Sequence, residues 1–260
     1  MKKIVVCDLD GTLLDEQNNV IPGTKELIQS FIDDCGIFII ATGRLDHDIV
    51  YVEEYLGIKS DYRISQNGAV IKDSNNNLIL KNEIDSEVSK QIFKELDNNG
   101  DLRIEVSDLN RRYFPSERLD GGGAEFVDSS VIDPELFKKI GNEIIPIIFL
   151  IFGDIHIFKS INETINEKFS NHVDSIMTSK NTLEILNKGV SKGKALDEIM
   201  KMHHIRSKNI FAIGDAENDI SLFQFANYSY VMEHASEYVK KQAKIIKPNV
   251  KECMEEILSI

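Results

Sequence analysis

The sequence is poor in residues that constrain a chain covalently or locally. Its 260 residues include no tryptophan, five prolines and three cysteines. The cysteines, Cys7, Cys35 and Cys253, are odd in number, widely spaced and without a Cys-x-x-Cys pair, which argues against a disulfide framework and against a zinc site. We therefore expect three reduced, buried thiols in a reducing compartment.

Long apolar segments are also lacking. Lys2 and Lys3 precede only four apolar residues before Asp8, which is too short for the apolar centre of a signal peptide. The longest apolar run, from Ile144 to Phe152, contains Pro146 and falls far short of a membrane span. The sequence therefore predicts a soluble, cytoplasmic protein with no membrane partner.

Basic side chains are in deficit. The chain carries 30 basic and 43 acidic side chains, which gives a formal net charge of -13. Nucleic acids and anionic membranes would be repelled by this charge, so neither is expected as a partner. A small anionic substrate remains compatible with it, because a few cationic groups and backbone N–H groups can make one pocket positive.

The two ends of the sequence alternate short apolar runs with amphipathic stretches. Runs such as Ile37 to Ala41 are β-branched and stop at polar, glycine-containing turns, which is typical of strands buried in a parallel sheet. We predict strands at 3–7, 37–41, 209–213, 228–232 and about 243–246, and helices at about 24–35, 46–56, 194–203, 219–225, 236–244 and 251–258. This alternation predicts an α/β fold with a Rossmann-like parallel-sheet core.

The middle of the chain has a different character. An Asn-rich turn at Asn75 to Asn77 predicts a β-hairpin. Beyond it we predict strands near 102–106, 112–114, 147–152, 175–179 and 182–186, and helices near 86–98, 134–142 and 162–170. The mixture indicates an α+β unit at 83–186, inserted into a core formed by 1–82 and 187–260. Gly121 to Gly123 reads as a loop of this unit, and a solvated turn is favoured over a substrate role.

Three predicted strands end in polar turns. These turns are Asp8-Leu-Asp10-Gly-Thr12, Thr42-Gly-Arg44 and Gly214-Asp215-Ala-Glu-Asn218-Asp219. In open α/β sheets, ligands bind beyond the carboxyl ends of the strands, so we expect the three turns to meet at one site.

The groups expected there suit a phosphorylated ligand. Thr42 offers a hydroxyl, and Gly43 a backbone N–H that a phosphate can approach closely. Lys192, near a predicted helix start, would add a cation at a natural anion-binding position. Mg²⁺ prefers hard oxygen ligands, which the carboxylates of Asp8, Asp10 and Asp215 supply. The set predicts phosphoryl transfer, in which positioning and charge neutralisation provide most of the catalysis.

Plainer interpretations compete with each of these assignments. An isolated Asp-x-Asp-Gly is more often a turn or a helix cap than a catalytic motif. Lys188 and Lys194 compete with Lys192, which is preferred through motif order rather than through spacing. Arg44 is at least as readily explained by pairing with a carboxylate as by binding a substrate.

Taken together and in this order, the motifs resemble those of the haloacid dehalogenase superfamily. The first and fourth motifs, with Thr42-Gly43-Arg44 and Lys192-Gly193 between them, carry the resemblance. The insert and the segment Gln66-Asn67-Gly68-Ala69 resemble the Cof-type phosphatases, which have an α/β cap. The resemblance spans nearly the whole chain, and it implies that residues 83–186 form a cap that sets substrate specificity.

The resemblance also implies roles for individual residues. Asp8 looks like the nucleophile that forms an aspartyl-phosphate, and Asp10 like the general acid and base. The implied Mg²⁺ ligands are Asp8, Asp215 and the backbone carbonyl of Asp10, with Asp219 as a supporting residue that orients Lys192 or a metal-bound water. The implied substrate-binding residues are Leu9, Thr42, Gly43, Lys192 and Asn218, of which Thr42 and Lys192 would also take part in catalysis.

The expected function is Mg²⁺-dependent hydrolysis of small phosphorylated metabolites, with sugar phosphates as the first substrate class to test. A phosphomutase and a non-catalytic aspartyl-phosphate switch are the alternatives. A switch would need neither an acid and base at Asp10 nor an inserted cap. The chain departs from many relatives at Glu233-His234, where a small-residue turn is common. A monomer is the expected assembly.

Overall fold

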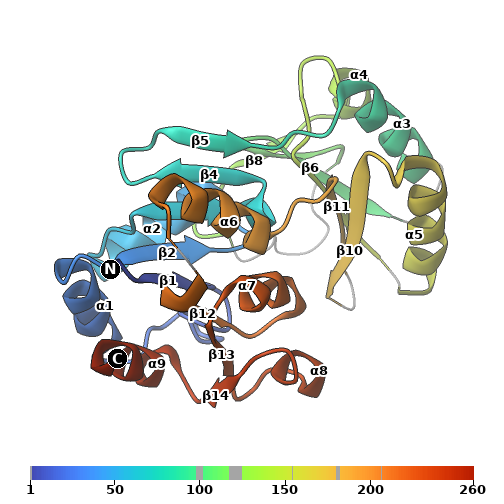
Figure 1. Ribbon diagram of the computed structural model, residues 1–260. Coiled ribbons are helices and arrows are strands. Elements are labelled where there is room, and N and C mark those ends of the chain that lie inside the picture. The colour runs from blue at the N-terminus through green and yellow to red at the C-terminus, as the bar shows by residue number, and fades with distance from the viewer. Residues whose placement is uncertain (1, 98–101, 117–124, 154, 180–181, 206) are drawn as a thin grey trace. The chain divides into compact units, whose positions relative to one another are not determined.

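The chain folds as two compact units (Figure 1). Unit 1 comprises Met1–Leu80 and Ser191–Ile260, and unit 2 comprises Lys81–Val190. The computed structural model describes residues 2–97, 102–116, 125–153, 155–179, 182–205 and 207–260. The loop predicted at Gly121 to Gly123 lies outside the described residues.

Unit 1 is built on an eight-stranded sheet in the order β14-β13-β12-β1-β2-β3-β4-β5. Neighbouring strands from β14 to β3 are parallel, and β4 runs antiparallel to β3. The strands are β1 (Ile4–Cys7), β2 (Ile37–Ala41), β3 (Tyr62–Ser65), β4 (Val70–Asp73), β5 (Leu78–Lys81), β12 (Ile210–Gly214), β13 (Tyr228–Met232) and β14 (Ile245–Lys247). This arrangement confirms the predicted α/β fold with a parallel-sheet core.

Helices bury the faces of this sheet. Ile4 and Val6 of β1 lie in one apolar cluster with Leu196 and Ile199 of α6, and α1 packs against α9 elsewhere in the unit. Every residue of β1 is buried, which explains why the strand is apolar throughout rather than alternating. The helices of unit 1 are α1 (Thr24–Asp33), α2 (Asp46–Leu56), α6 (Lys192–His203), α7 (Ile220–Phe225), α8 (Glu237–Lys240) and α9 (Val250–Ser259).

The order of the strands brings the predicted polar turns together. β1 lies between β2 and β12 and is parallel to both. The carboxyl ends of these three strands therefore lie at the same edge of the sheet (Figure 1). The turns that begin at Asp8, Thr42 and Asp215 follow directly, as the sequence predicts.

Unit 2 contains a six-stranded sheet in the order β10-β11-β9-β6-β7-β8. Its neighbours are antiparallel except for β7 and β8. Its core joins α3 and α5 to the sheet through residues such as Ile92, Phe158 and Ile151. The elements are α3 (Ser86–Asp97), β6 (Arg103–Ser107), β7 (Arg112–Phe114), β8 (Ser130–Ile132), α4 (Leu136–Lys139), β9 (Ile148–Phe152), α5 (Ile155–Phe169), β10 (Val173–Ser179) and β11 (Thr182–Asn187).

Several predicted boundaries in the chain were wrong. Helix α5 begins at Ile155, seven residues before the predicted start, and the buried residues Phe158, Ile161 and Ile165 have the helical spacing that the prediction missed. Strand β8 was not predicted, because its three residues depend on pairing with β7. Helix α8 ends at Lys240, four residues early, although Ser236 caps it as expected.

The three cysteines differ in their burial. All three are free. Cys7 and Cys253 are buried, but Cys35 is exposed in the turn after α1, with a positive φ of 63°. The predicted burial of Cys35 was therefore wrong.

Throughout the described parts of both units, no helix combines the length and the apolar character needed to cross a membrane.

Candidate active site

Asp8 stands at the end of the central strand and is nearly buried. Its backbone N–H donates to the carbonyl of Ile213 at 2.9 Å, which continues the β1–β12 ladder to the site. Its side chain is only 6% exposed, and its Oδ1 accepts a hydrogen bond of 2.6 Å from the ammonium of Lys192. The carboxylate is therefore fixed beside a cation rather than solvated.

Lys192 is the first residue of α6, where Ser191 caps the helix by accepting the backbone N–H of Lys194. Its Nζ bridges Asp8 and Asp219, with 2.7 Å to Oδ1 of Asp219. Of the three lysines that the sequence offered, this is the one that reaches Asp8. Lys188 pairs with a carboxylate of unit 2, Asp174, and Lys194 is exposed.

Asp219 uses its whole carboxylate within the site. Oδ1 accepts from Lys192, and Oδ2 accepts the backbone N–H groups of Asp215 and Ala216 at 3.0 Å each. The carboxylate folds back under Gly214, where a Cβ would come within 2.5 Å of it. A side chain at position 214 would displace Asp219, so the glycine is needed for this arrangement.

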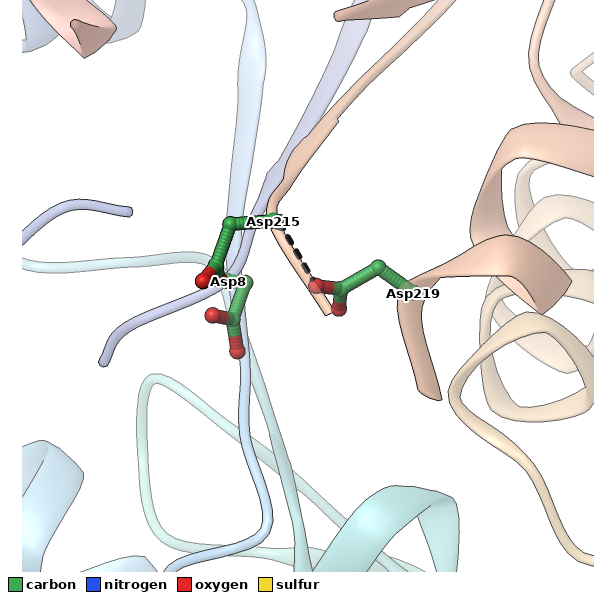
Figure 2. A group of neighbouring side chains, drawn as sticks. All are labelled: Asp8, Asp215 and Asp219. Carbon is green, nitrogen blue, oxygen red and sulfur yellow. Dashed lines mark hydrogen bonds between the residues drawn. The ribbon is translucent and has the colours of Figure 1, made fainter. Parts of the chain in front are cut away.

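Three carboxylates converge near the carboxyl ends of β1 and β12. Figure 2 shows Asp8 and Asp215 side by side with Asp219 beyond, and its dashed line marks the hydrogen bond between Asp215 and Asp219. One oxygen from each lies within 4.8 Å of the others. Oδ1 of Asp215 also accepts from the hydroxyl of Thr12 at 3.0 Å. Three formal negative charges face one ammonium, so the donor set fits a divalent cation that prefers oxygen.

The site shifts the ionisation of its members. Burial raises the pKa of Asp8, the charge of Asp219 raises it further, and Lys192 opposes both. Burial and Asp219 likewise raise the pKa of Asp215. Burial alone would lower the pKa of Lys192, but Asp219 and Asp8 outweigh it and raise the pKa above its ordinary value. A further positive charge near Asp8 and Asp215 would favour their ionised forms.

Asp10 has very different surroundings. Its side chain is 45% exposed, and its carboxylate forms a two-pronged ion pair with Arg44. The hydroxyl of Thr42 lies 3.4 Å from Oδ2 of Asp10 and accepts the backbone N–H of Arg44 at 3.2 Å. The expectation that Arg44 pairs with a carboxylate is confirmed, and the partner is the predicted acid and base.

The predicted phosphate contacts lie nearby. The side chain of Asn218 donates to Oδ1 of Asn67 at 2.9 Å, and its own Oδ1 is buried without a partner among the described residues. The amide of Asn67 also lies 3.3 Å from the place of a Cβ on Gly43. The side chain of Leu9 is fully buried, so only its backbone could reach a substrate.

Two neighbours of the site were missed by sequence reasoning. Asn67 lies between Gly43 and Asn218 in a left-handed conformation, with φ of 55°, and its backbone N–H donates to the carbonyl of Thr42 at 3.0 Å. Nε2 of His234, in the unusual turn after β13, lies 3.4 Å from Oδ2 of Asp215. The Asn-Gly step and the departure at His234 were visible signals, but their partners lie far away in the sequence.

Comparison with known proteins gives this site a context. The sequence matches the family model described as haloacid dehalogenase-like hydrolase over residues 5–253. A protein of Buchnera aphidicola subsp. Schizaphis graminum with a provisional phosphatase name is 28% identical over 246 residues, covering 93% of this chain and 88% of that protein. A Bacillus subtilis protein named 5-amino-6-(5-phospho-D-ribitylamino)uracil phosphatase is 27% identical over 274 residues, covering 94% and 92%.

Solved structures share the fold. A protein of Thermotoga maritima superposes with a TM-score of 0.83 at 24% identity, covering 98% of this chain and 97% of that one. At this identity the likeness establishes the fold alone. The matches in sequence and in structure extend over nearly the whole chain, as the motif resemblance predicted.

Proposed function

This chain belongs to the haloacid dehalogenase-like hydrolases and is a phosphatase of the Cof type, and we propose that it hydrolyses small phosphorylated metabolites through an aspartyl-phosphate on Asp8. The observation that carries the proposal is the placement of Asp8. It is a buried carboxylate at the end of the central strand, bound by Lys192, with Asp215 beside it and Asp10 held separately.

In the first step, a carboxylate oxygen of Asp8 attacks the substrate phosphorus. The bond from phosphorus to the leaving oxygen breaks as Asp10 gives that oxygen a proton. Lys192 keeps its charge beside Asp8 throughout, because Asp219 holds it from the other side. The backbone at Leu9 and Gly43 and the side chains of Thr42 and Asn218 hold the phosphoryl oxygens.

In the second step, Asp10 takes a proton from water, whose oxygen attacks the phosphorus of the aspartyl-phosphate. The bond between phosphorus and Asp8 breaks, and inorganic phosphate leaves. Asp10 has then regained the proton that it gave away. This return distinguishes hydrolysis from a stable phospho-switch, which needs no acid and base two residues from the nucleophile.

Asp8, Asp215 and the backbone carbonyl of Asp10 are the groups that we propose to hold Mg²⁺. Bound there, Mg²⁺ would neutralise charge on Asp8 and on the phosphoryl group. Asp219 is already committed to Lys192 and to two backbone N–H groups, so we assign it to support rather than to metal binding.

Unit 2 is the proposed cap, and it would select the substrate and exclude bulk water during turnover. A cap favours small substrates over phosphoproteins. Sugar phosphates are the first class to test, and the name of the Bacillus subtilis relative adds a phosphorylated ribitylamino pyrimidine to the panel. We propose that the protein acts as a monomer.

The test is phosphate release across this panel, with Mg²⁺ and with EDTA, by the wild type, Asp8→Asn and Asp10→Asn. We expect Asp8→Asn to lose at least about 10⁴-fold in kcat, since a nucleophile cannot be replaced by its neighbours. Asp10→Asn should lose about 10²–10⁴-fold, the usual contribution of general acid–base catalysis. Equal phosphate release by the wild type and Asp8→Asn would refute the mechanism.

Two further outcomes separate the parts of the proposal. Full activity in EDTA would refute the Mg²⁺ assignment and leave the nucleophile standing. A phosphomutase would isomerise the substrate with little phosphate release, which product analysis by phosphorus NMR would reveal.

A further inference from the structure

Arg44 holds Asp10 by a geometry that only an arginine can make. Its Nε lies 2.8 Å from Oδ2 of Asp10, and its Nη2 lies 2.6 Å from Oδ1. These two hydrogen bonds match the planar fork of a guanidinium to the two oxygens of a carboxylate. Lysine would provide a charge at this place without fixing the plane of the carboxylate.

Arg44 is itself fixed from the protein side. Its Nη1 lies 3.7 Å from Oδ2 of Asp48, a fully buried residue in the first turn of α2. The side chain of Arg44 is 12% exposed, whereas that of Asp10 is 45% exposed. Burial alone would lower the pKa of Arg44, but the contacts with Asp10 and Asp48 raise it, so the guanidinium remains charged. An exposed carboxylate is thus attached to a buried support.

The location of Asp10 matches what its proposed role requires. Attacking and leaving oxygens lie on opposite sides of phosphorus in an in-line displacement, so the acid must stand apart from the nucleophile. The carboxylate of Asp10 lies outside the group formed by Asp8, Asp215 and Asp219. Within the described parts of the chain, the other side-chain contact of this carboxylate is the hydroxyl of Thr42, at 3.4 Å from Oδ2, so Arg44 supplies most of its restraint.

We propose that Arg44 is a positioning residue that aims Asp10 for proton transfer, with Asp48 as its anchor. The inference rests on the proposed function, because it presupposes Asp10 as acid and base. It predicts that loss of Arg44 slows the step that depends most on Asp10, the hydrolysis of the aspartyl-phosphate. The attack of Asp8 on a substrate with a good leaving group should be spared.

Para-nitrophenyl phosphate separates the two steps, because nitrophenolate leaves phosphorus without needing a proton. Rapid mixing with Mg²⁺ and excess substrate would follow nitrophenolate for the wild type, Arg44→Gln, Arg44→Lys and Asp48→Asn. Glu54→Gln, an exposed charge on the same helix as Asp48, is the matched control. Thermal melting and the affinity for orthovanadate, a phosphate mimic, are measured on every variant.

For Arg44→Gln we expect a burst of about one nitrophenolate per enzyme at the wild-type rate, followed by a steady state slowed about tenfold to a hundredfold, a part of the usual acid–base contribution. Arg44→Lys should recover part of the loss, and Asp48→Asn should show a smaller loss of the same kind. Melting temperature, orthovanadate affinity and the Glu54→Gln kinetics should match the wild type.

Other outcomes would overturn the inference. A burst slowed as much as the steady state, with weaker orthovanadate binding, would make Arg44 a substrate ligand. A burst lost together with a lower melting temperature would make it structural. Wild-type kinetics in every Arg44 variant would refute the inference alone. Full activity of Asp8→Asn would refute the proposed function and the inference with it.

Discussion

Asp8 and Asp10 are two residues apart on one turn, yet their surroundings differ in nearly every respect. Asp8 is buried and shares the ammonium of Lys192 with Asp219. Asp10 is half exposed and faces a guanidinium whose own anchor is buried. The Asp8 carboxylate thus belongs to a buried network of charged groups, whereas the Asp10 carboxylate lies outside that network and partly in solvent.

The difference teaches how one residue type could suit the two tasks that we propose for Asp8 and Asp10. A nucleophile benefits from a fixed position and from cations that favour its ionised form, which Lys192 supplies. An acid and base must exchange protons with a leaving group and with water, so it needs access as well as alignment. Burial beside the ammonium of Lys192 would meet the needs of a nucleophile. Partial exposure beside the planar guanidinium of Arg44 would meet those of an acid and base.

Replacing Lys192 should break the Asp8 side of this comparison, with a larger effect than a change of pH or of His234. Lys192→Met leaves two buried carboxylates without their cation, so we expect kcat to fall by about 10²–10³-fold and the free energy of unfolding to fall by about 3 kcal/mol. Lys194→Met, two residues on and exposed, is the control. Phosphatase assays and urea unfolding measure both effects, and equal behaviour of the two variants would disprove the assigned role.

The pH dependence of metal binding should sharpen the comparison. Burial and Asp219 raise the pKa of Asp8 and of Asp215, so protons compete with a cation at pH values above the ordinary carboxyl range. Mg²⁺ affinity should therefore rise with pH through this range, by about tenfold per pH unit for each proton displaced.

Calorimetry of Mg²⁺ binding in buffers of different ionisation enthalpy would count the protons released. Proton release should diminish once the pH exceeds the raised pKa values of Asp8 and Asp215. An affinity that stays constant as the pH rises above the ordinary carboxyl range would contradict the raised pKa values expected from the burial of Asp8 and Asp215.

His234 offers the smallest and most local test. Its Nε2 lies 3.4 Å from Oδ2 of Asp215, but its side chain is 57% exposed. Groups that orient a metal-binding carboxylate often contribute tenfold or more to affinity; for so exposed a contact we expect His234→Asn to weaken Mg²⁺ binding only about two- to fivefold. Calorimetric titration with Mg²⁺ would measure it, with His204→Asn as the control. Unchanged affinity would assign His234 to the surface.

The sequence predicted most of unit 1 for a physical reason. Strands β2 and β13 and helix α2 were placed at their observed bounds, because a strand buried on both faces is uniformly apolar and a helix shows its spacing within one segment. Unit 2 was predicted less well. The start of α5 and the whole of β8 depend on contacts made across the unit, which a single sequence does not display.

The same limit applies within the site. The order of the motifs identified Asp8, Asp215 and Lys192 as residues that would meet, and the structure brings them together. The pairing of Arg44 with Asp10 spans 34 residues, and that of Asn67 with Asn218 spans 151. Such pairs follow from how the turns lie beside one another, so they become visible only in the folded chain.

The central position of β1 has a further consequence for the behaviour of the molecule over time. Sheets open from their edges, and the edge strands β14 and β5 can exchange their amide protons without disturbing the interior. Opening β1 requires the hydrogen-bond ladders to β2 and to β12 to break together. We therefore expect the amide protons of β1 to exchange slowly, and Asp8, the proposed nucleophile, to keep its place through the fluctuations that open the edge strands.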